Sequence, residues 1–540
     1  MTTPRLSPEA VLGKWFPDLP GFRPHQREVI DRLVDGRSTL MLMPTGGGKS
    51  LSYQVPALVQ DKIGVVISPL IALMREQSDK LTQRGIQALS LGGLEPKQAQ
   101  QRLRQFDFAN GPGFILTSPE RAETDGFLEY VLQRNRERVA LVAIDEAHCI
   151  STWGHDFRPP YKSIPGFLDR AFGRGIWPPV LCLSATLDAD SQNEVLTDFR
   201  MDHSCVVKSA NMLRSNLSLS IETFAHNADK VPALTELADC HRGHKIIVYA
   251  HLKQNRKFGT RALAELLRSH GHRAAAFDAD LPLTERDQVI EGFRIGSIDL
   301  VCATGAFGMG IDIPDIRGVI HFLLPESIEQ YYQEAGRAGR DGGPAFGVLM
   351  YTPKNSEVRE DMLGSAKIDV TTVQTLWDEL IDSGKGTIKS VSPSLEFQGR
   401  ERDYALFQAL QKAGALELVA RGPRGIKAFE AHTAEGTQFI STISAATRTG
   451  NFLAAFRRLG VDPAKGYLEL FEHYARDDVR LIATPDNVLV FRVGALAPEH
   501  AASIAADFNA RVARRLSQFH SFREIVETNN LDTALQARFG

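Results

Sequence analysis

Before about residue 353, the chain alternates between short apolar runs and longer segments whose apolar positions have helical spacing. Unbroken apolar runs are typical of parallel strands that are buried on both faces of a sheet. The first set of runs ends before Thr186 and predicts a doubly wound parallel sheet. Its predicted strands are residues 39–42, 65–67, 114–116, 139–144 and 180–183.

A polar connection at residues 208–218 leads to a second set of runs with the same alternation. This set predicts another parallel sheet. We therefore expect an α/β fold with two tandem lobes, the first over residues 1–207 and the second over residues 208–353. The predicted strands of the second lobe are residues 246–249, 274–277, 299–302 and 318–322.

Helix-like stretches dominate beyond residue 353, with short strand pairs around residues 418–429 and 481–493. Two helical stretches followed by a strand pair around the turn at residues 421–425 have the order of a winged helix, although any helical pair before a hairpin has that order. We assign a possible winged helix to residues 354–432. The rest, 433–540, is predicted to be mainly helical, with one or two long helices over residues 501–529.

The composition is that of a globular protein, with 43% hydrophobic and 24% charged residues. A net charge of -3 and a pI near 6.6 exclude a uniformly basic nucleic-acid coat, so contacts with phosphates must come from local patches. No apolar run reaches membrane-spanning length and no secretion signal is recognised, so we expect a cytoplasmic protein without a membrane partner. The five cysteines form no CxxC pair, so no zinc is expected.

The glycine-rich run Met-Pro-Thr-Gly-Gly-Gly-Lys-Ser at residues 43–50 carries the first chemistry. It lies between a predicted strand and a predicted helix, where backbone N–H groups can close on phosphate oxygens. Lys49 is expected to span the β- and γ-phosphates of ATP, and Ser50 to ligate Mg²⁺. The strict pattern has glycine where Met43 stands. The predicted nucleotide-binding residues here are Thr45, Gly46, Gly47, Gly48, Lys49 and Ser50.

Asp145 and Glu146 directly follow the apolar run 139–144. Ligands bind at the carboxyl ends of strands in open α/β sheets. We therefore expect Asp145 to hold Mg²⁺ through water and Glu146 to polarise the attacking water. Together with the glycine-rich loop, this pair predicts an ATP-hydrolysing site.

Three further segments could complete that site. Arg23 and Gln26 lie at the right distance before the loop to stack on and read adenine. Arg337 and Arg340, three residues apart in the second lobe, could neutralise charge on the γ-phosphoryl group when the cleft closes. A glycine-rich loop at residues 304–312 follows a predicted strand of the second lobe, and its candidate nucleotide-binding residues are Gly310 and Asp312.

This ordered set resembles superfamily 2 helicases, and residues 10–355 resemble the RecQ family of DNA helicases with their two RecA-like lobes. The most discriminating stretch is Cys149-Ile150-Ser151-Thr152-Trp153-Gly154-His155-Asp156-Phe157-Arg158-Pro159, which is similar to that family's aromatic-rich loop. Aromatic side chains there can stack on unpaired bases. The resemblance implies that Arg340 is the arginine finger, that Arg337 is the second motif arginine, and that the motor moves 3′ to 5′ on single-stranded DNA. The implied DNA-binding residues are Ser68, Pro69, Ser118, Trp153, His155, Phe157, Arg158 and Thr304.

The chain departs from the RecQ pattern in two places. Two carboxylates, Asp278 and Asp280, stand in a run where relatives usually carry Tyr-His-Ala-Gly-Leu, which would weaken grip on the DNA backbone. The four-cysteine zinc module that usually follows the motor is absent, and the last segment only faintly resembles its helical hairpin. Arg421, Arg424 and Lys427 could touch phosphates as a wing, but a solvated turn explains them equally well.

We therefore expect an ATP-dependent DNA helicase or translocase that acts on single-stranded and tailed or forked DNA with ATP and Mg²⁺. One alternative is a DNA-stimulated ATPase subunit of a multi-protein repair or anti-phage complex, with a protein partner bound through the C-terminal region. A second alternative is an RNA helicase, since superfamily 2 shares the nucleotide-site motifs.

Overall fold

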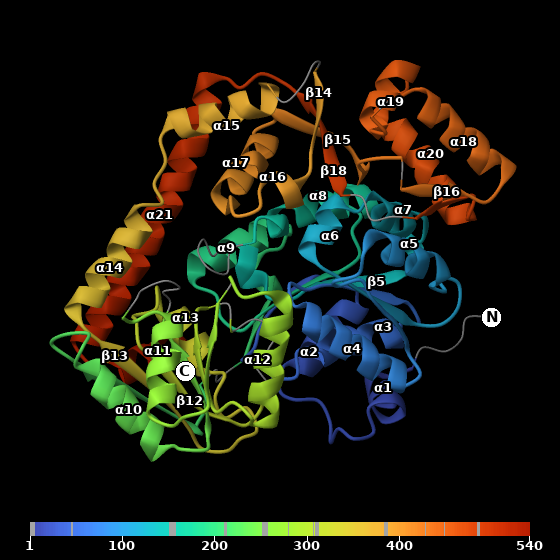
Figure 1. The fold of residues 1–540 in the computed structure, drawn as a ribbon. Coiled ribbons are helices and arrows are strands. Elements are labelled where there is room, and N and C mark those ends of the chain that lie inside the picture. Colours follow the sequence, from blue (N-terminus) through green and yellow to red (C-terminus); the bar gives the residue numbers. More distant parts are fainter. Residues whose placement is uncertain are drawn as a thin grey trace.

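The protein is described from a computed structural model, shown in Figure 1, in which two α/β lobes lie side by side. A C-terminal region lies over the first lobe, and a long helix descends from it to the second lobe. The description covers residues 6–44, 47–150, 158–209, 213–250, 257–278, 280–305, 307, 313–382, 387–426, 428–447, 449–482 and 486–539.

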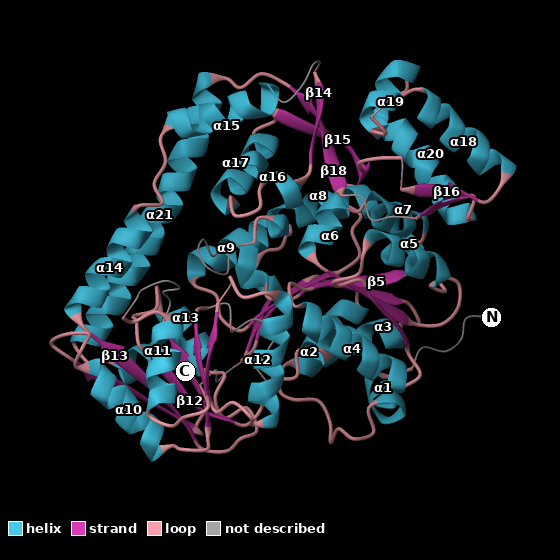
Figure 2. Ribbon diagram, viewed as in Figure 1, coloured by secondary structure: helices cyan, strands magenta, loops and turns pink. Residues whose placement is uncertain are grey.

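The first lobe contains a seven-stranded sheet with the order β3-β4-β2-β5-β6-β1-β7, whose pairs are all parallel. Helices cover both faces of this sheet (Figure 2). Its strands are β1 (Thr39–Leu42), β2 (Ile63–Ile67), β3 (Gln87–Ser90), β4 (Gly113–Thr117), β5 (Val139–Ile144), β6 (Val180–Ser184) and β7 (Val206–Lys208). Its helices are α1 (Pro8–Trp15), α2 (Gln26–Val34), α3 (Leu51–Val59), α4 (Ile71–Gln83), α5 (Pro96–Gln105), α6 (Pro119–Thr124), α7 (Gly126–Arg134), α8 (Pro160–Phe172) and α9 (Ala189–Asp198), with 3-10 turns η1 (Arg136–Arg138), η2 (Ala147–Ile150) and η3 (His203–Cys205).

Strand β5 shows why this lobe folds as a doubly wound sheet. All six of its residues are buried, and it lies between β2 and β6 in the middle of the sheet. An uninterrupted apolar strand must be covered on both faces. The loop after β1 and the loop after β5 therefore meet at the same edge of the sheet, as predicted.

The second lobe contains a six-stranded parallel sheet with the order β10-β11-β9-β12-β13-β8. Its strands are β8 (Leu217–Thr223), β9 (Lys245–Tyr249), β10 (Ala274–Phe277), β11 (Leu300–Ala303), β12 (Ile316–His321) and β13 (Ala345–Tyr351). Its helices are α10 (Lys230–Cys240), α11 (Thr260–Ser269), α12 (Leu283–Ile295) and α13 (Ile328–Ala335). The prediction of two tandem parallel-sheet lobes is confirmed, and the sequence reading missed the strands β3, β7, β8 and β13.

The C-terminal region contains a three-stranded antiparallel sheet with the order β14-β18-β15 and a separate pair β16-β17. Its strands are β14 (Ile388–Val391), β15 (Leu416–Pro423), β16 (Phe429–Ala431), β17 (Val479–Leu481) and β18 (Asn487–Val493). Its helices are α14 (Pro353–Gly364), α15 (Val370–Asp382), α16 (Pro393–Glu396), α17 (Glu401–Lys412), α18 (Ala434–Ala445), α19 (Phe452–Leu459), α20 (Pro463–Arg476), α21 (Pro498–Glu527) and α22 (Leu531–Phe539).

The predicted hairpin around residues 421–425 is wrong. In the described residues β15 pairs with β18, from Leu416 opposite Val493 to Pro423 opposite Asn487, and β16 pairs with β17. Residues 424–486 therefore form an insertion between two paired strands. The sequence reading divided this region at residue 432, whereas the sheet joins strands from both sides of that point.

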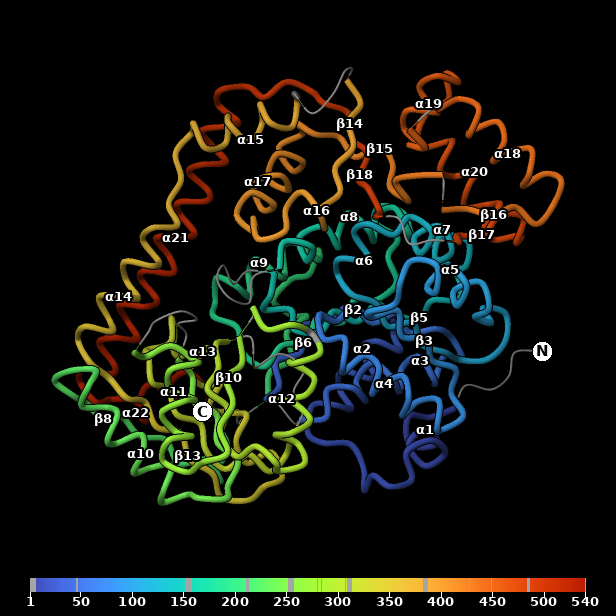
Figure 3. The backbone as a smooth tube through the Cα atoms, in the orientation of Figure 1, coloured from blue at the N-terminus to red at the C-terminus, as the bar shows by residue number. Residues whose placement is uncertain are grey.

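Helix α21 is 30 residues long and connects the C-terminal sheet with the second lobe. Its first half packs beside α15, and α14 lies along it, as the tube in Figure 3 shows. Its last turns and α22 bury a set of aromatic and aliphatic side chains against the second lobe, which are Phe519, Phe522, Val526, Leu531, Leu535 and Phe539. No helix in the described part of the chain is long and apolar enough to cross a membrane.

Candidate active site

The glycine-rich loop follows β1 and leads into α3, whose N-cap is Ser50. Gly48 has φ +80°, and a Cβ on it would lie 2.8 Å from Gln26 Nε2. A Cβ on Gly47 would lie 2.5 Å from Cγ of Met43. Met43 thus occupies the space beneath the loop, and the glycines are required by close packing. Thr45 and Gly46 lie outside the described residues.

Gln26 and Arg23 lie against this loop. Gln26 is buried, and its Nε2 donates to the carbonyl of Gly48 at 2.9 Å. Its Oε1 accepts the backbone N–H of Arg23 at 2.6 Å. The amide therefore braces the phosphate loop in this structure, and reading adenine remains a prediction for it.

Asp145 lies at the carboxyl end of β5 and is fixed from several sides. Its Oδ2 accepts from Ser68 Oγ at 3.1 Å, and its carbonyl accepts from Tyr161 Oη at 2.7 Å. Glu146, the next residue, has φ +51°, a left-handed conformation that is uncommon outside glycine. Strained backbone of this kind persists where the surrounding structure enforces it, as it does at many active sites.

The two carboxylates differ in their electrostatic surroundings. Burial raises the pKa of Asp145 to about 6, and repulsion from Glu146 adds to the effect. Burial also opposes ionisation of Glu146, but the hydrogen bond from His148 and the charge of Lys49 outweigh it and lower the pKa of Glu146 to about 2. Glu146 therefore ionises more readily than Asp145, which suits a residue that polarises water.

The two lobes meet at this point. His148 Nδ1 lies 3.2 Å from Glu146 Oε2, and His148 Nε2 lies 3.4 Å from Nε2 of Gln333, which belongs to α13 of the second lobe. Burial lowers the pKa of His148, but the neighbouring Cys149 and Glu146 outweigh it and raise the pKa well above its usual value. Which atom donates in the contact with Gln333 depends on the protonation of the ring. The charge of Arg337 also favours the ionised form of Glu146. One side chain of the first lobe's acidic motif thus contacts the second lobe's arginine-bearing segment.

A buried pair fixes α13 within the second lobe. His321, at the end of β12, places Nε2 2.8 Å from Glu334 Oε2, and Gln330 Nε2 donates to Glu334 Oε1 at 3.0 Å. The ring of Tyr249 stacks on His321 at 5.4 Å. The sequence alone assigns no role to His148 or Gln333, because their contact joins segments 185 residues apart.

Ser50 and Asp145 are the predicted ligands of Mg²⁺, and the site fits a divalent cation. Asp145 is a half-buried carboxylate whose pKa is raised by desolvation and by Glu146, and a bound cation favours its ionised form. The described residues contain no group of three or more His, Cys, Asp or Glu side chains that could hold a metal ion. This is compatible with magnesium, which keeps several waters and uses one or two protein ligands.

The predicted DNA-binding residues lie in different environments. Ser68 is 2% exposed and directed at Asp145, which differs from the predicted strand contact, and Thr304 is 1% exposed. Ser118 is half-buried and caps α6 by accepting from the N–H of Arg121 at 3.2 Å. Arg158 Nη1 lies 3.2 Å from Oε1 of Glu120, which belongs to α6. Pro69 is buried, and Trp153, His155, Phe157, Gly310 and Asp312 lie outside the described residues.

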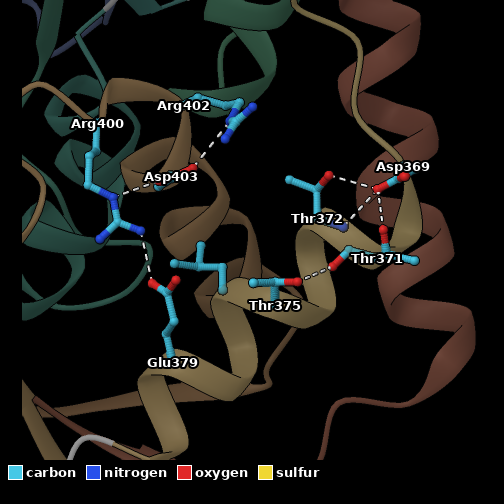
Figure 4. Close-up of a pocket in the computed structure, with 9 residues that line it drawn as sticks. Asp369, Thr371, Thr372, Thr375, Glu379, Arg400, Arg402 and Asp403 are labelled. Atoms are coloured by element: carbon cyan, nitrogen blue, oxygen red, sulfur yellow. Dashed lines mark hydrogen bonds and ion pairs between the residues drawn. The ribbon is translucent and has the colours of Figure 1, made fainter.

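A polar cavity of about 300 Å³ lies away from this site, in the C-terminal region between α15 and the first turn of α17 (Figure 4). Arg400 binds both Glu379 and Asp403, and Asp369 accepts from the hydroxyls of two threonines. Most of its charged groups therefore neutralise one another.

Comparison with known proteins follows the same division into lobes. A family model described as DEAD/DEAH box helicase matches residues 23–195, and one described as helicase conserved C-terminal domain matches residues 229–342. The ATP-dependent DNA helicase RecQ of Haemophilus influenzae is 38% identical over 334 residues, which are 62% of this chain and 51% of that protein. The chain belongs to the RecQ family of superfamily 2 helicases.

A second relative, the probable ATP-dependent DNA helicase RecS of Bacillus subtilis, is 35% identical over 345 residues, which are 63% of this chain and 66% of that protein. The chain spans about half the length of the RecQ proteins of Haemophilus influenzae and Pasteurella multocida, at 51% and 50%.

Two solved structures share the fold. The DUF1998 helicase MrfA bound to DNA has a TM-score of 0.53 at 19% identity, over 65% of this chain and 52% of that one. The helicase Lhr of Mycobacterium smegmatis, bound to single-stranded DNA and AMP-PNP, has a TM-score of 0.51 at 20% identity, over 81% of this chain and 62% of that one.

Proposed function

We propose that this protein is an ATP-dependent DNA helicase or translocase of RecQ type, which moves 3′ to 5′ on single-stranded DNA. The observation that carries the proposal is the contact of Gln333 with His148 across the lobes, beside Glu146. Hydrolysis at such a site depends on how the lobes are arranged, so a cycle of ATP binding and hydrolysis can move them relative to each other. RecQ-family membership supports DNA as the polymer.

The residues of the nucleotide site are proposed to have separate roles. Gly47, Gly48 and Lys49 hold the phosphates of ATP, while Glu146 orients and polarises the attacking water. Arg337 and Arg340 bring positive charge from the second lobe to the transferring phosphoryl group. Mg²⁺, held by Ser50 and Asp145, neutralises phosphate charge when bound.

DNA is proposed to lie across the segments that border α6 and the aromatic-rich loop. Ser118 begins α6, and Arg158 at the end of the aromatic-rich loop contacts Glu120 of that helix. The aromatic-rich loop begins at Cys149, which is three residues after Glu146 in the sequence. Binding of a DNA strand to this loop can therefore change the position of the Glu146 carboxylate through a short segment of chain. Phosphate contacts of this kind carry no sequence information.

We further propose that the C-terminal region contains a winged helix, whose wing is the strand pair β15-β18 with the insertion 424–486 between its strands. Its other elements are α15, β14, α16 and α17. The sheet order supports this proposal, because β18, the last of the three strands in the sequence, lies between β14 and β15. The domain limits proposed for the motor remain 1–207 and 208–353. A cytosolic location and the absence of zinc remain proposals that follow from the DNA substrate and the cysteine distribution.

A second candidate function is a DNA-stimulated ATPase subunit with little unwinding of its own. The burial of Arg421 against the first lobe favours it, because Arg421 was one of three side chains that could have touched duplex phosphates as a wing. The C-terminal region would then offer its exposed surface to a protein partner.

Strand displacement on 3′-tailed and 5′-tailed duplexes separates these functions, with Lys49→Ala as the inactive control. We expect unwinding of the 3′-tailed DNA alone and no turnover by Lys49→Ala. ATP turnover that DNA stimulates without strand displacement would favour the second candidate. Stronger stimulation by RNA than by DNA of equal length would reassign the polymer. In measurements of ATP binding and turnover, Trp153→Ala should retain ATP binding and lose most of the stimulation of turnover by DNA.

A further inference from the structure

Arg421 of β15 is buried at the junction between the C-terminal region and the first lobe. It is 4% exposed, and its Nη1 donates to the carbonyls of Ala122 at 3.0 Å and Glu123 at 2.6 Å. Its Nη2 contacts the carboxylate of Glu129 in α7. The two carbonyls belong to the last turn of α6, where a cation is favoured by the helix dipole. One guanidinium thus caps α6 and ties it to α7.

Helix α17 holds the same end of α6. Glu123 is 3% exposed and accepts hydrogen bonds from the hydroxyl of Tyr404 and from Gln408 Nε2, the latter at 2.9 Å. The ring of Tyr404 is itself stacked on Phe397 at 5.0 Å. Side chains of α17, in the C-terminal region, therefore hydrogen-bond to the first lobe.

The junction is closely packed rather than incidental. A Cβ on Gly126, at the start of α7, would lie 2.5 Å from the carbonyl oxygen of Arg421 and 2.6 Å from Phe471. The ring of Phe127 lies 5.4 Å from that of Tyr474 in an edge-on arrangement. Interfaces with this density and with buried, partnered charge have a defined geometry.

The opposite end of α6 is the end proposed to meet DNA. Ser118 is its N-cap, and Glu120 in its first turn holds Arg158 of the aromatic-rich loop. Helix α6 spans only residues Pro119–Thr124, so a shift at its C-terminal carbonyls moves its first turn as well. We propose that Arg421 is a positioning residue for DNA-stimulated ATP hydrolysis, because it fixes α6 and thereby the strand-facing Ser118 and Glu120.

This inference rests on the proposed DNA-dependent ATPase and is tested on the full chain. The assay is ATP turnover as a function of single-stranded DNA concentration. In Arg421→Gln, the DNA concentration for half-maximal stimulation should rise about fivefold, the size of change expected when a coupling residue is altered. The KM for ATP and the turnover without DNA should change less than twofold, since the ATP site is not touched.

Arg424 provides a matched control. It is exposed, lies three residues further along the same segment, and was grouped with Arg421 in the sequence reading. Arg424→Gln should behave as the wild type. If Arg424→Gln weakens DNA binding and Arg421→Gln does not, the segment is a DNA-contacting wing and the inference is overturned.

Tyr404→Phe is a second variant that removes no buried charge and keeps the ring against Phe397. It should raise the half-maximal DNA concentration in the same direction, by about twofold. It decides the question if Arg421→Gln does not fold. Wild-type DNA dependence in a folded Tyr404→Phe and in any folded Arg421→Gln overturns the inference, as does an equal loss of turnover with and without DNA. A wild-type protein that DNA does not stimulate overturns the proposed function itself.

Discussion

The contact between Gln333 and His148 offers the sharpest test of how the lobes cooperate. The two nitrogens lie 3.4 Å apart and the pair is partly buried. A typical side-chain hydrogen bond contributes about 0.5–1.5 kcal/mol. If it forms fully only in the closed transition state, Gln333→Ala should lower kcat by about threefold to tenfold and leave the KM for ATP nearly unchanged.

A double-mutant cycle isolates that contact from other effects of each substitution. His148→Ala should lower kcat more than Gln333→Ala, because it also removes the partner of Glu146. Adding Gln333→Ala to His148→Ala should then cost little, since the contact is already gone. DNA-stimulated turnover of the four proteins at saturating ATP measures the coupling. Fully additive effects would refute the claim that these two side chains act together across the lobes.

Three further predictions concern separate parts of the molecule. Gly48→Ala should abolish tight ATP binding, measured by equilibrium titration, because its Cβ would lie 2.8 Å from Gln26 Nε2 and Gly48 has φ +80°; affinity within twofold of the wild type would contradict this. Phe522→Ala should destabilise the second lobe by about 3–5 kcal/mol, because Phe522 is 1% exposed in the core that joins α21 to that lobe; urea unfolding checks this, and Arg402→Ala on the exposed surface should be near neutral. Burial raises the pKa of Glu123 to about 7, so the docked C-terminal region is favoured at acid pH and loses that stability as the pH rises through about 7; Glu123→Gln should lessen the fall in thermal stability over this pH range, and a fall equal to that of the wild type would contradict the assignment.

The sequence predicted those parts of the fold that depend on buried strands. Strand β5 is apolar throughout, so its place in the middle of a parallel sheet and the position of Asp145 at its carboxyl end both follow from one run of residues. Strand β8 was missed because its residues alternate between half-buried and exposed positions at the edge of the sheet. Edge strands lack the continuous apolar signal of central ones.

Contacts between distant segments could not be read from the sequence. Gln333 and His148 are 185 residues apart, and their proximity depends on how two independently folded sheets face each other. Arg421 has the sequence context of an exposed turn, with glycine and proline directly after it. Its burial follows from the pairing of β15 with β18 beyond a long insertion, which no local pattern reveals.

The central claim is that arginines of the second lobe complete an ATP site built on the first. The most direct test is single-turnover ATP hydrolysis in the presence of DNA for Arg337→Ala and Arg340→Ala, with ATP affinity measured separately. The account predicts affinity within a few-fold of the wild type and hydrolysis slower by at least about a hundredfold in each variant. Hydrolysis at the wild-type rate in both would show that the first lobe works alone and would contradict the account.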